Sequence, residues 1–205
     1  MSVSLEDSPS RTLWMYDVFL SFRGADVRNN FFSHLDDALK EEGIVTFSDD
    51  KELERGNLIW EGLERAMEQS RFAVVVISKD YATSHWCLRE LSFLVDLAEK
   101  KRLELIPIFY ETDPSKLKSG TGCFKEALEK HELRFDVEMV NSWRRALAII
   151  GNIAGWDSNR IDDAKLVQKV TQNLSERLYS ESSEEATELV GMSFHKKGIE
   201  SLLSN

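Results

Sequence analysis

The chain has 205 residues, 36 of them acidic and 26 basic, so its formal charge at pH 7 is −10. Charged residues make up 30 % and hydrophobic residues 42 %, a composition typical of a globular protein rather than a disordered one. No apolar run approaches the roughly 20 residues that a membrane-spanning helix needs, so we expect no membrane segment. The negative charge argues against general nucleic-acid binding, which depends on clustered cations that neutralise phosphates.

The two cysteines, Cys87 and Cys123, are too few for a disulfide framework and lack the spacing of a structural zinc site. We therefore expect a reducing compartment.

The sequence divides into three parts. We expect residues 1–13 to be a flexible polar leader, residues 14–180 to form one folded domain, and residues 181–205 to start with an acidic, linker-like stretch.

Apolar runs and helical periodicities alternate along residues 14–180. In order, they predict a strand at 16–22, a helix at 30–42, a strand at 44–47, a helix at 58–70, a strand at 72–77, a helix at 86–101, a strand at 105–110, irregular helices within 115–151, a possible strand at 153–156 and a last helix at 162–178. This alternation is typical of a parallel sheet covered by helices on both faces.

The strand at 72–77 is apolar at every position, which indicates burial on both faces of a parallel sheet. With five strands, the expected fold is α/β and flavodoxin-like, with strand order 2-1-3-4-5. Pro107 cannot donate a ladder hydrogen bond, so its strand should lie near an edge of the sheet or be bulged there. Ligands of such folds bind outside the carboxyl ends of the strands, where the strand order reverses. The loops after Phe22 and Ile77 are therefore the candidate site.

The loop after the first strand offers Phe22, Arg23, Gly24 and Asp26. An arginine suits a phosphate or carboxylate, a glycine lets the backbone approach a ligand, and a phenylalanine ring could stack on a base. The alternative is a plain tight turn with a solvated arginine.

The segment after the strand at 72–77 leads into a helix that Thr83 or Ser84 could cap. Glu90 falls in its first or second turn, near the expected cleft, although such a carboxylate can simply favour the helix dipole. Cys87 is more typical of a small buried side chain than of a nucleophile, because no base stands at helical spacing. The sequence offers no metal site beyond the pair Asp49 and Asp50, which is more typical of a turn.

Two other α/β classes do not fit. A phosphoryl-receiving regulator would carry acidic residues where the first and third strands end, but these ends hold Ser21 to Arg23 and Ser78. A nucleotide triphosphatase would carry GxxxxGK[ST] after a strand, and that motif is absent.

The run Tyr16–Asp26, followed by Arg28, resembles the opening signature of plant TIR (Toll/interleukin-1 receptor) domains. Further segments are similar to successive blocks of that family and occur in the family's order: 49–56, 78–91, 106–110 with 113–115, and 143–156. Together they cover about residues 14–180. The tail from Leu189 resembles the entry to the nucleotide-binding domain of TIR-type immune receptors, so we expect either a receptor fragment or a truncated relative.

The resemblance implies an enzyme that cleaves NAD⁺ and is activated by self-association in plant immune signalling. It implies that Glu90 is catalytic. The residues it matches to substrate binding are Phe22, Arg23, Gly24, Ala25, Asp26, Gly56 and Trp86. It matches Ser33 and His34 to a TIR–TIR contact, and it implies no metal and no cofactor, because NAD⁺ is the substrate.

One carboxylate would suffice for this chemistry, because the cationic nicotinamide leaves as a neutral molecule and needs no general acid. The implied partners are a second copy of the chain and other TIR receptors, in the cytoplasm or also the nucleus. The main alternative function is a non-catalytic TIR–TIR adaptor. A nuclease or cyclic-nucleotide synthetase is a third, which the charge of −10 disfavours.

Overall fold

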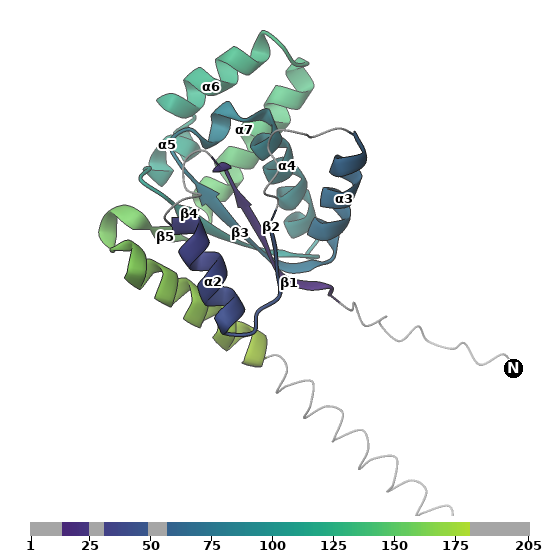
Figure 1. Cartoon of the computed structure of the whole chain (residues 1–205). Helices are drawn as coiled ribbons and strands as arrows, with labels where there is room; N and C mark the ends of the chain where they lie inside the picture. Colours follow the sequence, from purple (N-terminus) through teal and green to yellow (C-terminus); the bar gives the residue numbers. More distant parts are fainter. Residues whose placement is uncertain (1–13, 25–30, 49–56, 181–205) are drawn as a thin grey trace, which may run out of the picture.

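The computed structural model describes residues 14–24, 31–48 and 57–180 (Figure 1). The leader at 1–13, the tail at 181–205 and the block at 49–56, with the pair Asp49 and Asp50, lie outside these ranges. Among the described helices, none combines the length and apolar character needed to cross a bilayer.

Five parallel strands form one sheet in the order β2-β1-β3-β4-β5, which confirms the predicted topology. The strands are β1 (Tyr16–Phe22), β2 (Thr46–Ser48), β3 (Ser70–Ile77), β4 (Glu104–Phe109) and β5 (Trp156–Asp157). The neighbours β1 and β3 make up the centre of the sheet, and their carboxyl ends meet at the predicted switch point.

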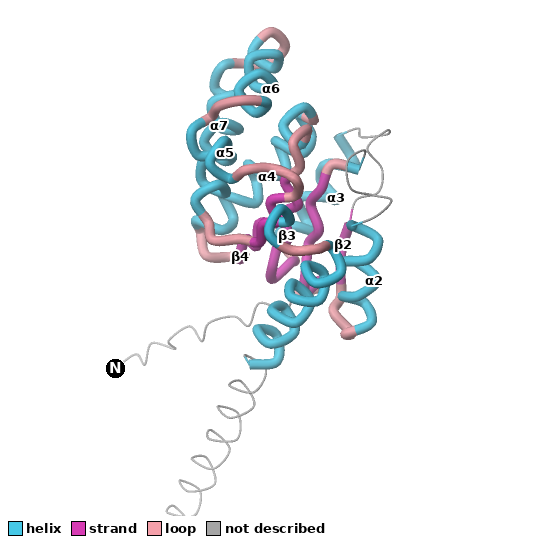
Figure 2. Tube along the Cα trace, turned by 90° about the vertical axis from the view of Figure 1, so that its left-hand side faces the viewer, coloured by secondary structure: helices cyan, strands magenta, loops and turns pink. Residues whose placement is uncertain are grey.

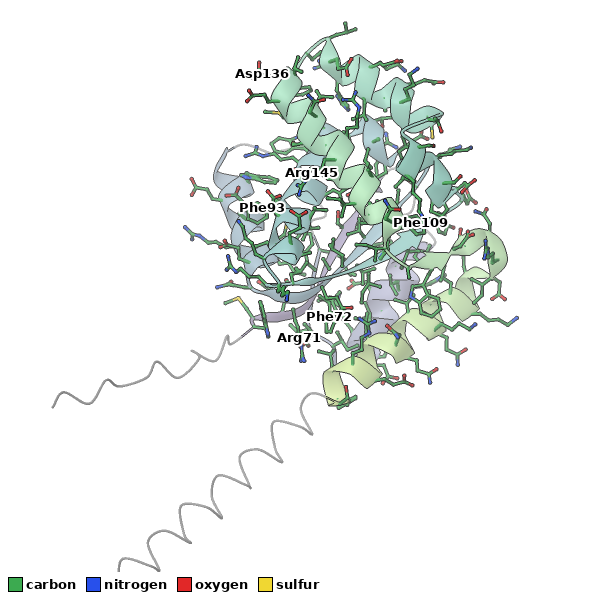
Figure 3. The ribbon with its side chains drawn as sticks, turned by 180° about the vertical axis from the view of Figure 1, so that it is seen from behind. Arg71, Phe72, Phe93, Phe109, Asp136 and Arg145 are labelled. Atoms are coloured by element: carbon green, nitrogen blue, oxygen red, sulfur yellow. The ribbon has the colours of Figure 1, made fainter. Side chains whose placement is uncertain are left out.

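Helices cover both faces of this sheet (Figures 1 and 2). The helical segments are α2 (Ser33–Glu41), α3 (Asn57–Glu68), η2 (Tyr81–Thr83), α4 (His85–Glu99), α5 (Pro114–Ser119), α6 (Cys123–Glu132), α7 (Val137–Asn152), η3 (Ser158–Arg160) and a C-terminal helix described over 163–180. One face carries α2 and the C-terminal helix, and the other carries α3, α4 and α7 (Figure 1). Arg145 of α7 reaches across to Asp96 and Glu99 of α4 (Figure 3).

The core has two halves because successive side chains of a strand point to opposite faces. In β1, Val18, Leu20 and Phe22 belong to the half beneath α2 and the C-terminal helix. Phe19 belongs to the half beneath α3 and α4, so Ser21, two residues further on, faces the same helices. This alternation decides which side chains of β1 can meet α4.

Several helices and strands begin or end at other residues than the sequence predicts. The strand predicted at 44–47 is β2 at Thr46–Ser48, because Ile44 still donates its N–H to Leu39 O at the end of α2. The helix predicted to end at Ser70 stops at Glu68, and Ser70 instead begins β3, with its hydroxyl donating to Ala66 O at 2.7 Å.

The strand predicted at 153–156 is the two-residue β5, which pairs only with Ile108 and Phe109. Pro107 therefore lies next to the edge of the sheet and beyond the β5 ladder, as its missing N–H predicts. Gly155 packs tightly against it, since a Cβ at that position would lie 2.5 Å from Pro107 O.

Candidate active site at the carboxyl ends of the central strands

The site is built where β1 and β3 end and α4 begins. After β3 the chain makes the short helix η2, and Ser84 then caps α4 by accepting a hydrogen bond from the Cys87 N–H at 3.4 Å. Capping at Ser84 sets where α4 begins, and the helix then turns Glu90 towards the sheet. Leu88 and Leu91 on the same side are fully buried.

Glu90 is 3 % exposed, which is unusual for a carboxylate in a protein core. The hydroxyl of Ser21, itself 1 % exposed, donates to Glu90 Oε2 at 3.2 Å. Ser21 faces α4 because of the alternation in β1, so the strand and the helix meet through this contact. A buried carboxylate needs such donors, because burial without hydrogen bonds costs far more than it returns.

Tyr81 of η2 completes the surroundings of this pair. Its ring is fully buried, and its hydroxyl lies 3.1 Å from Ser21 Oγ and 3.1 Å from the carbonyl oxygen of Cys87. The sequence interpretation missed both Ser21 and Tyr81. A signal was present in Ser21, a small polar residue inside an otherwise apolar strand, but only the fold shows which face it occupies.

Cys87 is fully buried, and its thiol lies 3.7 Å from the carbonyl oxygen of Phe22. This position agrees with the predicted role of a small core side chain that packs α4 against β1, and not with that of an exposed nucleophile.

Trp86 lies at the start of α4 and is half-buried. Its ring centroid is 6.2 Å from that of Trp60 in α3, and the guanidinium of Arg89 lies 3.8 Å from the Trp60 centroid and 5.8 Å from that of Trp86. Burial lowers the pKa of Arg89, and the nearby carboxylate of Glu64 opposes this effect. These cation–π contacts fix the first turns of α4 against α3.

The other predicted substrate-binding residues fall into two groups. Phe22 is 5 % exposed and stacks on Phe32 with ring centroids 3.7 Å apart, on the face of the sheet opposite Glu90. In this conformation its ring belongs to the core. Arg23, half-buried, and Gly24, buried, directly follow β1, whereas Ala25, Asp26 and Gly56 lie outside the described residues.

Ser33 and His34, predicted to serve self-association, are exposed in the first turn of α2. Further along α2, a groove of about 770 Å³ separates it from the C-terminal helix. Within the described ranges, no three His, Cys, Asp or Glu side chains are grouped as a metal site would require.

A parallel five-stranded sheet in this order, with a buried glutamate at the carboxyl ends of its central strands, defines a flavodoxin-like domain with a candidate site at the switch point. The family model of the TIR domain matches residues 15–192, so the chain belongs to the TIR family. The family resemblance noted in the sequence is therefore confirmed.

Plant disease-resistance proteins are among the relatives. The chain is 42 % identical over 202 residues to TMV resistance protein N of Nicotiana glutinosa, covering 97 % of this chain and 18 % of the relative. It is 40 % identical over 201 residues to disease resistance-like protein DSC2 of Arabidopsis thaliana, covering 98 % of this chain and 16 % of the relative. The chain thus spans less than a fifth of the length of either relative.

Among solved structures, the TIR domains of the activated Roq1 resistosome, which directly recognises the pathogen effector XopQ, match with a TM-score of 0.71 and 44 % identity. The match covers 78 % of this chain and 99 % of that chain. The heterodimer of the RPS4 and RRS1 TIR domains matches with a TM-score of 0.50 and 19 % identity, over 78 % of this chain and 95 % of that chain, and shares the fold.

Proposed function

We propose that the chain is an NAD⁺ glycohydrolase that releases nicotinamide and ADP-ribose-type nucleotide signals in plant immune and cell-death signalling. The observation that carries the proposal is Glu90, a carboxylate held in the core at the switch point by Ser21. Membership of the TIR family and the similarity to disease-resistance proteins support the biological setting.

The proposed chemistry needs one ionised carboxylate. The nicotinamide of NAD⁺ carries a positive charge and departs neutral, so no acid has to protonate it. Positive charge then builds on the ribose in the transition state, and an ionised Glu90 would stabilise that charge. Arg23, directly after β1, would bind the diphosphate, and Trp86, one turn before Glu90, would stack on a ring. Water would complete the hydrolysis.

The burial of Glu90 adds a condition to this proposal. With 3 % of the residue exposed, the carboxylate cannot touch a ribose until neighbouring groups move. We assign that movement to self-association through Ser33 and His34, which are exposed on α2. The activity per molecule should therefore rise with protein concentration. The cytoplasm, or also the nucleus, would be the site of action, and other TIR receptors would be further partners.

The test incubates purified protein with NAD⁺ at several protein concentrations, with and without a crowding agent, and follows nicotinamide by chromatography. Glu90→Ala should abolish release. Glu99→Gln is the matched control, since it alters an exposed glutamate of the same helix and should leave the rate unchanged. No release from wild-type protein that is folded and self-associated would favour the adaptor function instead.

A second variant tests the assembly step. Ser33→Ala/His34→Ala should lower both self-association and the rate at low concentration, because it removes the proposed contact side chains, which are exposed on α2. Light scattering and the nicotinamide assay would be run on the same samples. Full activity of this variant at every concentration would exclude that surface from activation.

A further inference from the structure

Three buried polar side chains from three different elements form a continuous chain beside the candidate site. Ser21 of β1 is 1 % exposed, Tyr81 of η2 is 0 % exposed, and Glu90 of α4 is 3 % exposed. Tyr81 Oη lies 3.1 Å from Ser21 Oγ, which lies 3.2 Å from Glu90 Oε2. Burying three such groups is costly unless each of them is hydrogen-bonded, and the two contacts that join them call for an explanation.

The number of protons that these groups can donate explains the arrangement. Each hydroxyl has a single proton to donate. When Glu90 is ionised, Ser21 must donate to it, and the 3.1 Å contact between Ser21 and Tyr81 is then a hydrogen bond only if Tyr81 donates to Ser21 Oγ. The direction of donation in this state runs from Tyr81 through Ser21 to the carboxylate.

When Glu90 is protonated, the same atoms serve a reversed chain. Glu90 then donates to Ser21 Oγ, Ser21 donates to Tyr81 Oη, and Tyr81 donates to the Cys87 carbonyl oxygen, also 3.1 Å away. The second acceptor at equal distance lets the Tyr81 proton change partner by rotating about the C–O bond. The carboxylate therefore keeps a partner in Ser21 in both protonation states.

We propose that Ser21 and Tyr81 are positioning residues for Glu90: together they hold its carboxylate in one orientation and direct a hydrogen bond to its ionised form. This inference rests on the proposed function, because it assigns the pair to the carboxylate of that same reaction. Tyr81 acts through Ser21, so it influences the reaction only while Ser21 has its hydroxyl.

A purely structural role is the competing explanation, and the strand β3 supplies a matched control for it. Ser70 is also fully buried in the sheet, and its hydroxyl also makes a hydrogen bond, to Ala66 O. It lies at the first residue of β3, whereas Ser21 lies near the carboxyl end of β1. Ser70→Ala therefore removes a comparable hydrogen bond from the sheet without touching the chain to Glu90.

The experiment measures kcat and KM for nicotinamide release from NAD⁺ at a fixed, assembly-promoting protein concentration, and thermal melting of every variant. Loss of a hydrogen bond to a charged group is expected to lower kcat of Ser21→Ala by about 10- to 100-fold. Tyr81→Phe should lower kcat by roughly 3- to 10-fold, since it weakens the Ser21 hydroxyl as a hydrogen-bond donor to Glu90 without removing that hydroxyl. KM should stay within about twofold, because neither hydroxyl contacts substrate.

The double variant distinguishes positioning from packing. If Tyr81 acts through Ser21, Ser21→Ala/Tyr81→Phe should match Ser21→Ala within about twofold, whereas independent damage would multiply the two losses. Ser70→Ala should melt earlier than wild type yet keep its kcat.

Three results would overturn the inference: unchanged kcat in both single variants, multiplied losses in the double variant, or an equal loss of kcat in Ser70→Ala. Should Ser21→Ala fail to fold, Tyr81→Phe alone decides, with unchanged kcat counting against the pair. Absence of Glu90-dependent release from wild-type protein is a separate outcome, visible without any of these variants, and it would overturn the proposed function together with this role.

Discussion

Replacing Phe22 distinguishes between two roles for its ring, stacking on the substrate and packing in the core. The sequence suggests a ring that stacks on the substrate, whereas the structure buries it to 5 % exposure against Phe32, on the face away from Glu90. Phe22→Leu removes the ring pair, worth about 0.5–1.5 kcal/mol, and leaves a partly filled space, so we expect a total loss of about 2 kcal/mol in the free energy of unfolding. For a domain of this size, that loss lowers the melting temperature by roughly 4–8 °C.

Two assays on the same preparation test this prediction. Denaturant unfolding should show the loss of stability, and the double variant with Phe32→Leu should lose less than the sum of the single variants, because the two rings share one contact. Below the melting temperature, KM for NAD⁺ should equal that of wild type. A KM raised severalfold with unchanged stability would refute the assignment of Phe22 to the core.

Two further predictions concern stability. Burial, and next the hydrogen bond to Asp163, raise the pKa of Tyr110 to about 12, so the stabilising contribution of its protonated phenol is full below pH 10 and is lost as the pH rises through about 12. As the pH rises from 10 to beyond 12, Tyr110→Phe should lose about 1 kcal/mol less of its free energy of unfolding than the wild type, after allowance for solvent screening. Equal losses in the two proteins would contradict this. Gly155→Ala places a Cβ 2.5 Å from Pro107 O and should destabilise the protein by about 1–3 kcal/mol in thermal melts, whereas Gly62→Ala, which meets nothing within 4 Å, should be neutral or stabilising.

The sequence predicted the order of the sheet because its signals are long and regular. The apolar strand at 72–77 and the helical stripes on either side of it leave few other arrangements. The same reasoning correctly placed Glu90 near the start of α4, with Ser84 as the cap. It predicted the short strands β2 and β5 but misplaced their bounds, because these depend on pairing with β1 and β4 and not on local preference.

The surroundings of Glu90 could not be predicted in the same way. Ser21 and Tyr81 are 69 and 9 residues from Glu90 along the chain, and only the packing of α4 on β1 brings them together. The face that Phe22 occupies depends on the strand's alternation relative to α4, which no local pattern fixes. The motifs therefore predict where the candidate site lies, and the fold determines which side chains of the motifs face it.

The most direct test of the central claim, that the negative charge of Glu90 drives the reaction, uses Glu90→Gln. This change keeps the size of the side chain and a carbonyl oxygen that can accept from Ser21, but it removes the charge. The measurement is the rate of nicotinamide release from NAD⁺ at the highest attainable protein concentration, with self-association checked in the same samples. We predict release by the wild type and, in an equally assembled Glu90→Gln protein, a loss of at least about 100-fold, in the range found when one electrostatic stabiliser is removed. Equal rates in the two proteins would contradict it.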